Sequence, residues 1–130
     1  MINGEEGVSR EDYQPSEDDN VLVQGVAGEP GGLGYFGHSY YEQNRGKLNL
    51  VKVDGGDGCV EPTVETIQSG EYKPLSRPLF MYPSTKALKR PEVKAFLEYV
   101  VDNYQAIADA SQIVAMSSEQ ADKSKSELGG

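Results

Sequence analysis

The chain has 130 residues, which fits one domain, and a domain of this size buries roughly 68% of its unfolded surface. Its 21 acidic and 12 basic residues give a net charge of −9, which argues against a nucleic-acid or anionic-membrane surface. The mean hydropathy is −0.56, so we expect long loops or tails around a modest core. The sequence has no apolar run of 18 residues, and the stretch after Met1 has neither a basic segment nor an apolar run, so neither a membrane span nor a signal peptide is expected.

Hydrophobic periodicity and turn residues predict an α/β pattern of short elements. In chain order, these are a helix at 16–28, a buried strand at 33–36, one or two helical turns at 39–45, a strand at 48–53, a short helix at 63–69, a strand at 77–83, a long helix at 91–110 and a polar helix at 117–128. Residues 1–15 form a loosely ordered lead-in, residues 16–116 the α/β body, and residues 117–130 a polar C-terminal helix or tail.

Capping residues mark the beginnings of the predicted helices. Ser16 precedes three acidic residues, so we expect it to cap the first helix. Thr63 stands where it can cap the short helix, and Pro91 fits the first position of the long one. The apolar residues of the long helix repeat at spacings of three, four and seven, which predicts that one face packs on the sheet. Ser117 or Ser118 caps the last helix.

His38 and Cys59 are candidates for chemistry because the chain has one histidine and one cysteine. His38 could act as a general base, but no Ser–His–Asp spacing accompanies it, and Ser39 is merely its neighbour. The pattern favours a structural or surface histidine. Cys59 has no internal disulfide partner, so it is buried, free, or paired with a group outside the chain. We therefore predict no catalytic residue, no metal site and no cofactor.

Two glycine-rich loops resemble ligand loops only in part. Counting from Asp54, an EF-hand would place ligands at its third and twelfth positions, which are Gly56 and Glu65, so only fragments of that pattern match. The loop at 28–34 lacks the Gly-Lys-Ser/Thr of a phosphate-binding loop. Both loops are predicted to be turns.

An aromatic cluster and an arginine complete the candidates. The aromatic cluster consists of Tyr35, Phe36, Tyr40 and Tyr41. These rings could stack on a ligand, and packing in the core and at its rim is the favoured use. Arg77 could clamp an anion, and a salt bridge is favoured.

Three stretches resemble the phosphate-binding proteins of ABC transporters. The first two, Glu17–Val26 (EDDNVLVQGV) and Pro30–Tyr41 (PGGLGYFGHSYY), closely resemble the second lobe of those proteins. The third joins Pro74–Tyr82 (PLSRPLFMY) to Lys89–Phe96 (KRPEVKAF) and looks like their later strand and long helix. The order and gaps fit throughout, and the resemblance covers nearly the whole chain.

The resemblance implies a partial lobe of a periplasmic-binding-protein-like α/β fold, with a small mixed sheet, flanking helices and a long C-terminal helix. Such receptors close two lobes on phosphate, held by backbone N–H groups, hydroxyls, an Arg and an acidic acceptor. The family's Ser-Gly-Thr anion motif is absent here, because Ser69 and Gly70 are followed by Glu71. Arg77 lies in a different motif from the family's phosphate Arg. No phosphate-binding residue is therefore carried over.

These implications define the expected function. We expect a non-catalytic part of a periplasmic or cell-surface receptor for inorganic phosphate, unable to bind phosphate by itself. Expected partners are the transporter permease, the missing first lobe, and a second copy that covers an open sheet edge. The alternative is a stand-alone interaction or dimerisation module with a contiguous apolar patch. An enzyme would have to use His38 with an acidic residue, and no hydrolase or metal motif supports it.

Overall fold

The structure is a computed structural model that describes residue 8 and residues 11–129. The elements in order are α1 (Asp19–Gly28), α2 (His38–Gln43), β1 (Val53–Asp54), β2 (Cys59–Val60), α3 (Val64–Ser69), α4 (Thr85–Leu88), α5 (Pro91–Asp102), α6 (Tyr104–Ala110) and α7 (Ser118–Gly129). The fold is helix-dominated, with one two-stranded sheet among the described residues. In that part of the chain, each helix is too short or too polar to cross a membrane.

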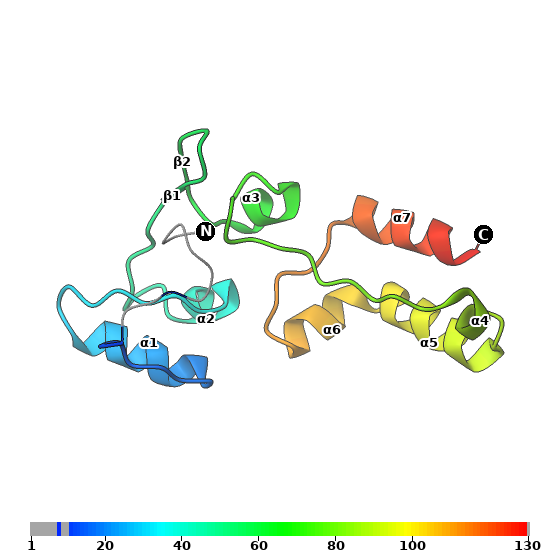
Figure 1. The fold of residues 1–130 in the computed structure, drawn as a ribbon, viewed down its shortest axis with the longest axis horizontal. Helices are drawn as coiled ribbons and strands as arrows, with labels where there is room; N and C mark the ends of the chain where they lie inside the picture. The colour runs from blue at the N-terminus through cyan, green and yellow to red at the C-terminus, as the bar shows by residue number, and fades with distance from the viewer. Residues whose placement is uncertain (1–7, 9–10, 130) are drawn as a thin grey trace.

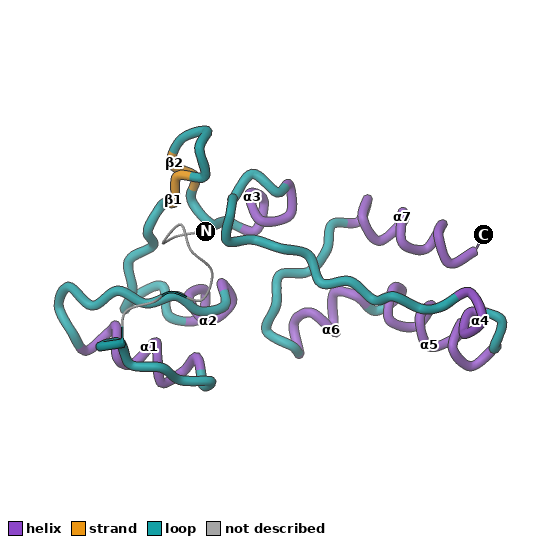
Figure 2. The backbone as a smooth tube through the Cα atoms, in the orientation of Figure 1, coloured by secondary structure: helices purple, strands orange, loops and turns teal. Residues whose placement is uncertain are grey.

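The elements gather into two groups joined by an extended stretch (Figure 1). We call residues 11–72, with α1 to α3 and the sheet, the N-terminal group, and residues 84–129, with α4 to α7, the C-terminal group. The connecting segment, residues 73–83, crosses between them as a loop (Figure 2). The chain exposes 10194 Å², whereas a compact monomer of 14.1 kDa exposes about 6,700 Å². The arrangement is therefore open.

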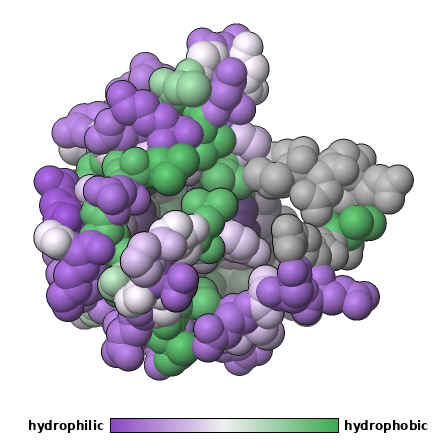
Figure 3. All heavy atoms as spheres, turned by 90° about the vertical axis from the view of Figure 1, so that its left-hand side faces the viewer, coloured by the Kyte–Doolittle hydropathy of each residue, from purple (hydrophilic) through white to green (hydrophobic). Residues whose placement is uncertain are grey.

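The N-terminal group is built mainly from capped helices and turns. Asp18, rather than the predicted Ser16, is the N-cap of α1, and its carboxylate accepts from the amide of Asn20 at 2.9 Å. Ser16 instead accepts a hydrogen bond from the amide of Asp18 at 3.1 Å. Thr63 caps α3 as predicted, in a reciprocal pair with Thr66. Figure 3 shows apolar side chains reaching the surface of this group between hydrophilic ones.

The predicted strands differ most from the structure. The stretches at 33–36 and 77–83 are loops, and the strand expected at 48–53 begins only at Val53. The sheet is an antiparallel pair in which Val53 lies opposite Val60 and Asp54 opposite Cys59. A strand exists only where a second strand completes its hydrogen-bond ladder. These predictions were wrong because the described residues offer no such partner at 33–36 or 77–83.

The C-terminal group is a helix assembly around α5. Pro91 opens α5 as predicted, but the helix expected at 91–110 is broken at Asn103 into α5 and α6. The Asn103 side chain donates to the Tyr99 carbonyl at 2.8 Å, and such local bonds compete with helix continuation. The prediction that this helix packs on the sheet was wrong. It packs on α7, where Leu97 and Val101 are buried.

Candidate functional site

A hollow of about 310 Å³ lies between the two groups, where α2, α3, α6 and the loop at 112–115 meet. Its size is at the lower end of small-molecule sites. One hydrogen bond joins two of its walls, because Gln68 donates to the Ala115 carbonyl at 2.8 Å. Gln120, of α7 and outside the lining, donates to the Gln68 carbonyl at 3.2 Å. The hollow is thus a junction between segments far apart in sequence.

His38 lines this hollow from the start of α2. Its side chain is only 10% exposed, and its Nε2 lies 3.4 Å from Oε1 of Glu42. The two atoms are outside hydrogen-bonding geometry, and Nε2 is buried without a hydrogen-bond partner in the described part of the chain. Ser39 also lines the hollow, but no hydrogen bond joins it to His38 among the described residues. The sequence favoured either a structural or a surface position for His38, and the structure places its side chain in the interior.

The charges of the hollow are negative. Glu42 and Asp109 are the charged residues of its lining. Arg45, outside the lining, holds Glu42 through Nε at 2.9 Å and Nη2 at 2.8 Å, and this hydrogen bond and charge raise the pKa of Arg45. Gln105 donates to Asp109 at 2.9 Å. Since Arg45 compensates Glu42, Asp109 is the lining charge without a cationic partner among the described residues, and it disfavours an anion such as phosphate.

The loop at 54–58 is a turn, as predicted. Oδ1 of Asp54 accepts from the amides of Gly56 at 2.8 Å and Gly58 at 3.1 Å. Both glycines have positive φ, which explains the glycine-rich sequence. No cluster of three or more His, Cys, Asp or Glu side chains is placed to hold a metal within residues 8 and 11–129. Cys59, next to this turn, is exposed and free.

The loop at 28–34 is also a turn, in which the Gly32 amide donates to the Glu29 carbonyl at 2.9 Å. Further along, the amide of Gly37, at the start of α2, donates to the Asp19 carboxylate at 3.3 Å. The aromatic cluster divides: Tyr35 is 91% exposed, whereas Tyr41 lies beside His38 with ring centroids 6.1 Å apart.

The three described arginines do not converge on one place. Arg90 is paired with Glu92 at 2.7 Å on the far side of the C-terminal group. Arg77 is exposed and has no hydrogen bond or ion pair among the described residues. The salt bridge favoured for Arg77 was therefore wrong. Among the described arginines, none is both unpaired and close to another group that could donate a hydrogen bond to an anion.

Sequence reasoning missed the polar residues of the junction. They are Gln68, Gln105, Asp109 and Gln112. Amide side chains are common on helix surfaces, so nothing local marked them. Gln112 alone carries a structural signal, a positive φ of 54°, and no sequence feature predicts that conformation.

The architecture is that of part of a periplasmic-binding-protein-like fold. Residues 4–103 match the family described as "PBP superfamily domain", and the chain belongs to this superfamily. The resemblance identified from the sequence blocks is thereby confirmed.

The relatives include named phosphate-binding proteins. "Protein SphX" of Synechococcus elongatus is 46% identical over 73% of this chain, and "Phosphate-binding protein PstS" of Staphylococcus epidermidis is 41% identical over 85%. A solved structure, "a possible phosphate binding protein from Planctomyces limnophilus DSM 3776", superposes on 98% of this chain with a TM-score of 0.88 and 41% identity.

The match covers only part of each relative. This chain spans 28% of the SphX protein, 35% of the PstS protein and 46% of the solved chain. It therefore resembles phosphate-binding proteins over about a third of the curated relatives' length. The names of the PstS protein and of the solved chain refer to phosphate binding, and the name of the SphX protein states no activity.

Proposed function

We propose that this chain is one part of a receptor for inorganic phosphate that delivers its ligand to an ABC-transporter permease in the periplasm or at the cell surface. The observation that carries the proposal is the 41% identity and TM-score of 0.88 to the solved phosphate-binding relative. The role is binding without catalysis, because His38 is buried beside Glu42 and no hydrogen bond joins it to Ser39 in the described part of the chain.

We further propose that the chain alone does not hold phosphate. A phosphate site needs converging N–H donors, usually with an arginine. Here Arg45 and Arg90 are paired with carboxylates, and Arg77 projects from the connecting segment. The hollow presents Asp109, whose charge repels phosphate, whereas the charge of Glu42 is compensated by Arg45. Together with the missing Ser-Gly-Thr motif, this leaves no cluster of cationic side chains for the anion among the described residues.

The test is a two-dimensional amide NMR titration of the 130-residue chain with millimolar phosphate. We expect dispersed peaks whose positions match those in chloride at equal ionic strength. Saturable shifts confined to a few residues would contradict the claim that the chain alone cannot bind. Shifts around Arg77 would single out that side chain, and Arg77→Gln should then abolish them.

A second candidate function is a protein-interaction module. The favouring observation is the run of exposed apolar residues in the connecting segment, from Leu79 at 69% to Tyr82 at 86% exposure. Contiguous apolar surface of this kind marks a site covered by another protein surface.

A further inference from the structure

One end of the C-terminal group is basic in a chain that is acidic overall. Residues 86–94, which cover most of α4 and the first turn of α5, contain four basic residues and one acidic residue. This stretch therefore carries a charge of +3, and the rest of the chain carries −12. We call it the basic end, and its basic residues are Lys86, Lys89, Arg90 and Lys94. The net charge of the chain is an average that does not describe this end.

The lysines of the basic end have no counter-charge. Arg90 holds Glu92 at 2.7 Å, so the acidic residue of this stretch is already paired with its arginine. Lys86, Lys89 and Lys94 form no side-chain hydrogen bond or ion pair within residues 8 and 11–129. Lys86 and Lys89 are exposed and three residues apart, which places them on the same face of α4. Three positive charges are thus left for a partner.

A second basic stretch, residues 45–52, shows what compensation looks like in this chain. It contains three basic residues and no acidic one. Arg45 is nevertheless paired with Glu42 at 2.7 Å, and Lys52 with Glu61 at 3.5 Å. The basic end differs because its lysines lack such partners in the described part of the chain.

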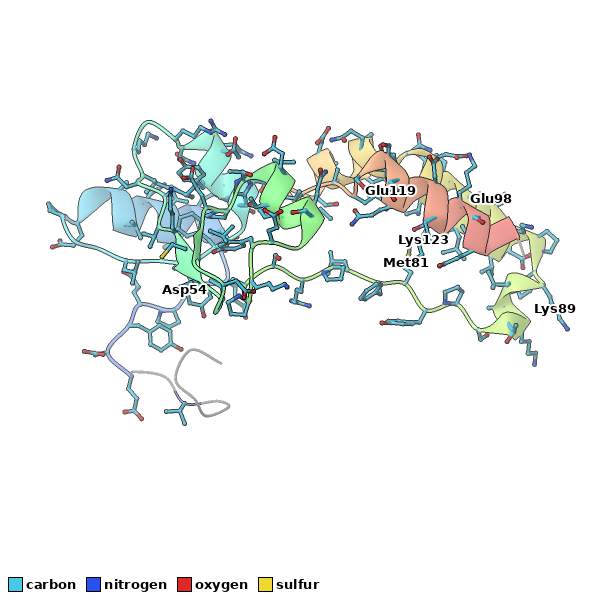
Figure 4. All side chains as sticks on the ribbon, turned by 90° about the horizontal axis from the view of Figure 1, so that it is seen from above. Asp54, Met81, Lys89, Glu98, Glu119 and Lys123 are labelled. Atoms are coloured by element: carbon cyan, nitrogen blue, oxygen red, sulfur yellow. The ribbon has the colours of Figure 1, made fainter. Side chains whose placement is uncertain are left out.

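The basic end lies at an extremity of the molecule. Figure 1 places α4 at the end of the C-terminal group that is remote from the N-terminal group, and Figure 4 shows Lys89 at that end. The helix α5, which separates α4 from α6, has 12 residues and is about 18 Å long. The acidic N-terminal group therefore lies beyond the Debye length of about 10 Å at 0.1 M salt, so its charges are largely screened here. The neighbouring α7 adds a net charge of only −1.

Lysines on a protruding end suit a broad anionic surface better than a shaped anion site. Bidentate recognition of one phosphate or carboxylate uses the arginine fork, whereas lysine is a hydrated point charge on a flexible stem. The fork of Arg90 is occupied, because its Nε and Nη2 both donate to Glu92. An acidic polypeptide would lose conformational entropy on ordering along the lysines. Lipid headgroups already form a surface, so several of them can meet the lysines together.

We propose that the basic end is a contact surface for membranes that contain anionic phospholipids. The contact is electrostatic adsorption through Lys86, Lys89 and Lys94, and no helix inserts into the bilayer. It goes beyond the receptor role and needs no free phosphate. Each lysine near an anionic surface strengthens partition about five-fold, so the three together should favour anionic over neutral membranes about 100-fold.

The test is cosedimentation of the 130-residue chain with vesicles in phosphate-free buffer of low ionic strength. One set of vesicles contains phosphatidylglycerol and phosphatidylcholine in equal parts, and the other contains phosphatidylcholine alone. We expect the chain to sediment with the anionic vesicles and to stay in solution with the neutral ones. Raising the salt to about 1 M, where the Debye length is about 3 Å, should release it.

Two double variants remove the same charge from different places. Lys86→Gln combined with Lys89→Gln removes two lysines of the basic end and should weaken partition about 25-fold. Lys47→Gln combined with Lys123→Gln is the matched control, because both lysines are exposed and lie outside the basic end. We expect the control to partition like the unchanged chain. Circular dichroism of each variant verifies that the helices remain.

Every other outcome counts against the proposal. Absence of binding to the anionic vesicles, or equal binding to the neutral ones, would overturn it. Equal losses in the two double variants would show that net charge alone governs partition, and would overturn the assignment to the basic end. Tighter binding to poly-L-glutamate than to vesicles at the same concentration of negative charge would identify an acidic polypeptide as the occupant instead.

Discussion

The two groups of this chain are stabilised by different means. In the N-terminal group, side chains bond to nearby backbone, as Thr63 does at α3 and Asp54 does in its turn, and the buried hydrophobic residues are Val23 and Leu48. In the C-terminal group, α7 covers α5, and the buried residues are Leu97, Val101, Ala108 and Ala121. The first group relies on local polar contacts and the second on burial between helices distant in sequence.

The groups meet through few hydrogen bonds. Gln68 lies in α3 and Ala115 lies 47 residues later, before α7, yet the side-chain nitrogen of Gln68 is 2.8 Å from the carbonyl oxygen of Ala115. A second bond joins Gln120 to the Gln68 carbonyl at 3.2 Å. Since a neutral hydrogen bond contributes only about 1 kcal/mol, this junction should let the groups respond separately to mutation.

The largest expected effect is in the C-terminal group. Leu97→Ala removes a side chain that is 6% exposed at the contact of α5 with α7, and should lower the free energy of unfolding of this group by about 2–3 kcal/mol. Urea denaturation with residue-resolved amide exchange measures it. Protection should fall in α5 and α7 while amides of α3 stay unchanged.

Leu33→Ala is the matched control, because Leu33 is 84% exposed in the N-terminal group. It should leave stability within experimental error. If Leu97→Ala weakened both groups equally, the two would form one cooperative unit and the comparison between them would fail.

A smaller effect is expected in the N-terminal group. Thr63→Ala removes the hydroxyl that accepts from the Thr66 amide at 3.2 Å, and should destabilise α3 by about 1 kcal/mol. Faster amide exchange at residues 64–70, with unchanged exchange in α5, measures this. Thr63→Ser keeps the acceptor and should retain most of the protection. A Thr63→Ala change that unfolded α5 would contradict the independence of the groups.

Helix ends were the most predictable feature because capping is local. Ser117 is one of the two predicted caps of the last helix. Its hydroxyl accepts from the backbone N–H of Gln120 at 3.2 Å, and its own backbone N–H donates to the side-chain oxygen of Gln120 at 2.9 Å. Gly70 ends α3 with a positive φ of 76°, which glycine adopts without strain. Each of these contacts spans only a few residues, so the sequence contains all its parts.

Strands and the hollow depend on partners distant in sequence. The apolar residues at 77–83 show a real tendency to extend, but pairing needs a second strand that the described residues lack. The hollow brings together α2, α3 and α6, and nothing in a single window of sequence indicates such a meeting. The carboxylates in the lining of the hollow, Glu42 and Asp109, could not be anticipated from any sequence motif.

The smallest expected effect is a pH dependence confined to α3. The pKa of Glu65 is lowered, first by a hydrogen bond from its own backbone amide at the helix start and then by the Thr63 hydroxyl. A lowered folded-state pKa means that this contribution to stability is fully present above the unfolded value, about 4.3, and is lost as pH falls through the folded value. The protection of α3 amides, taken relative to their intrinsic exchange rate at each pH, should therefore fall below about pH 4, and Glu65→Gln should remove that dependence. In Thr63→Ala the carboxyl loses the weaker of its two lowering bonds, so carbon-detected NMR should find its pKa closer to the ordinary value. A Glu65 that titrates identically in both proteins would show that the backbone amide alone lowers its pKa, and would reduce the role of Thr63 to capping.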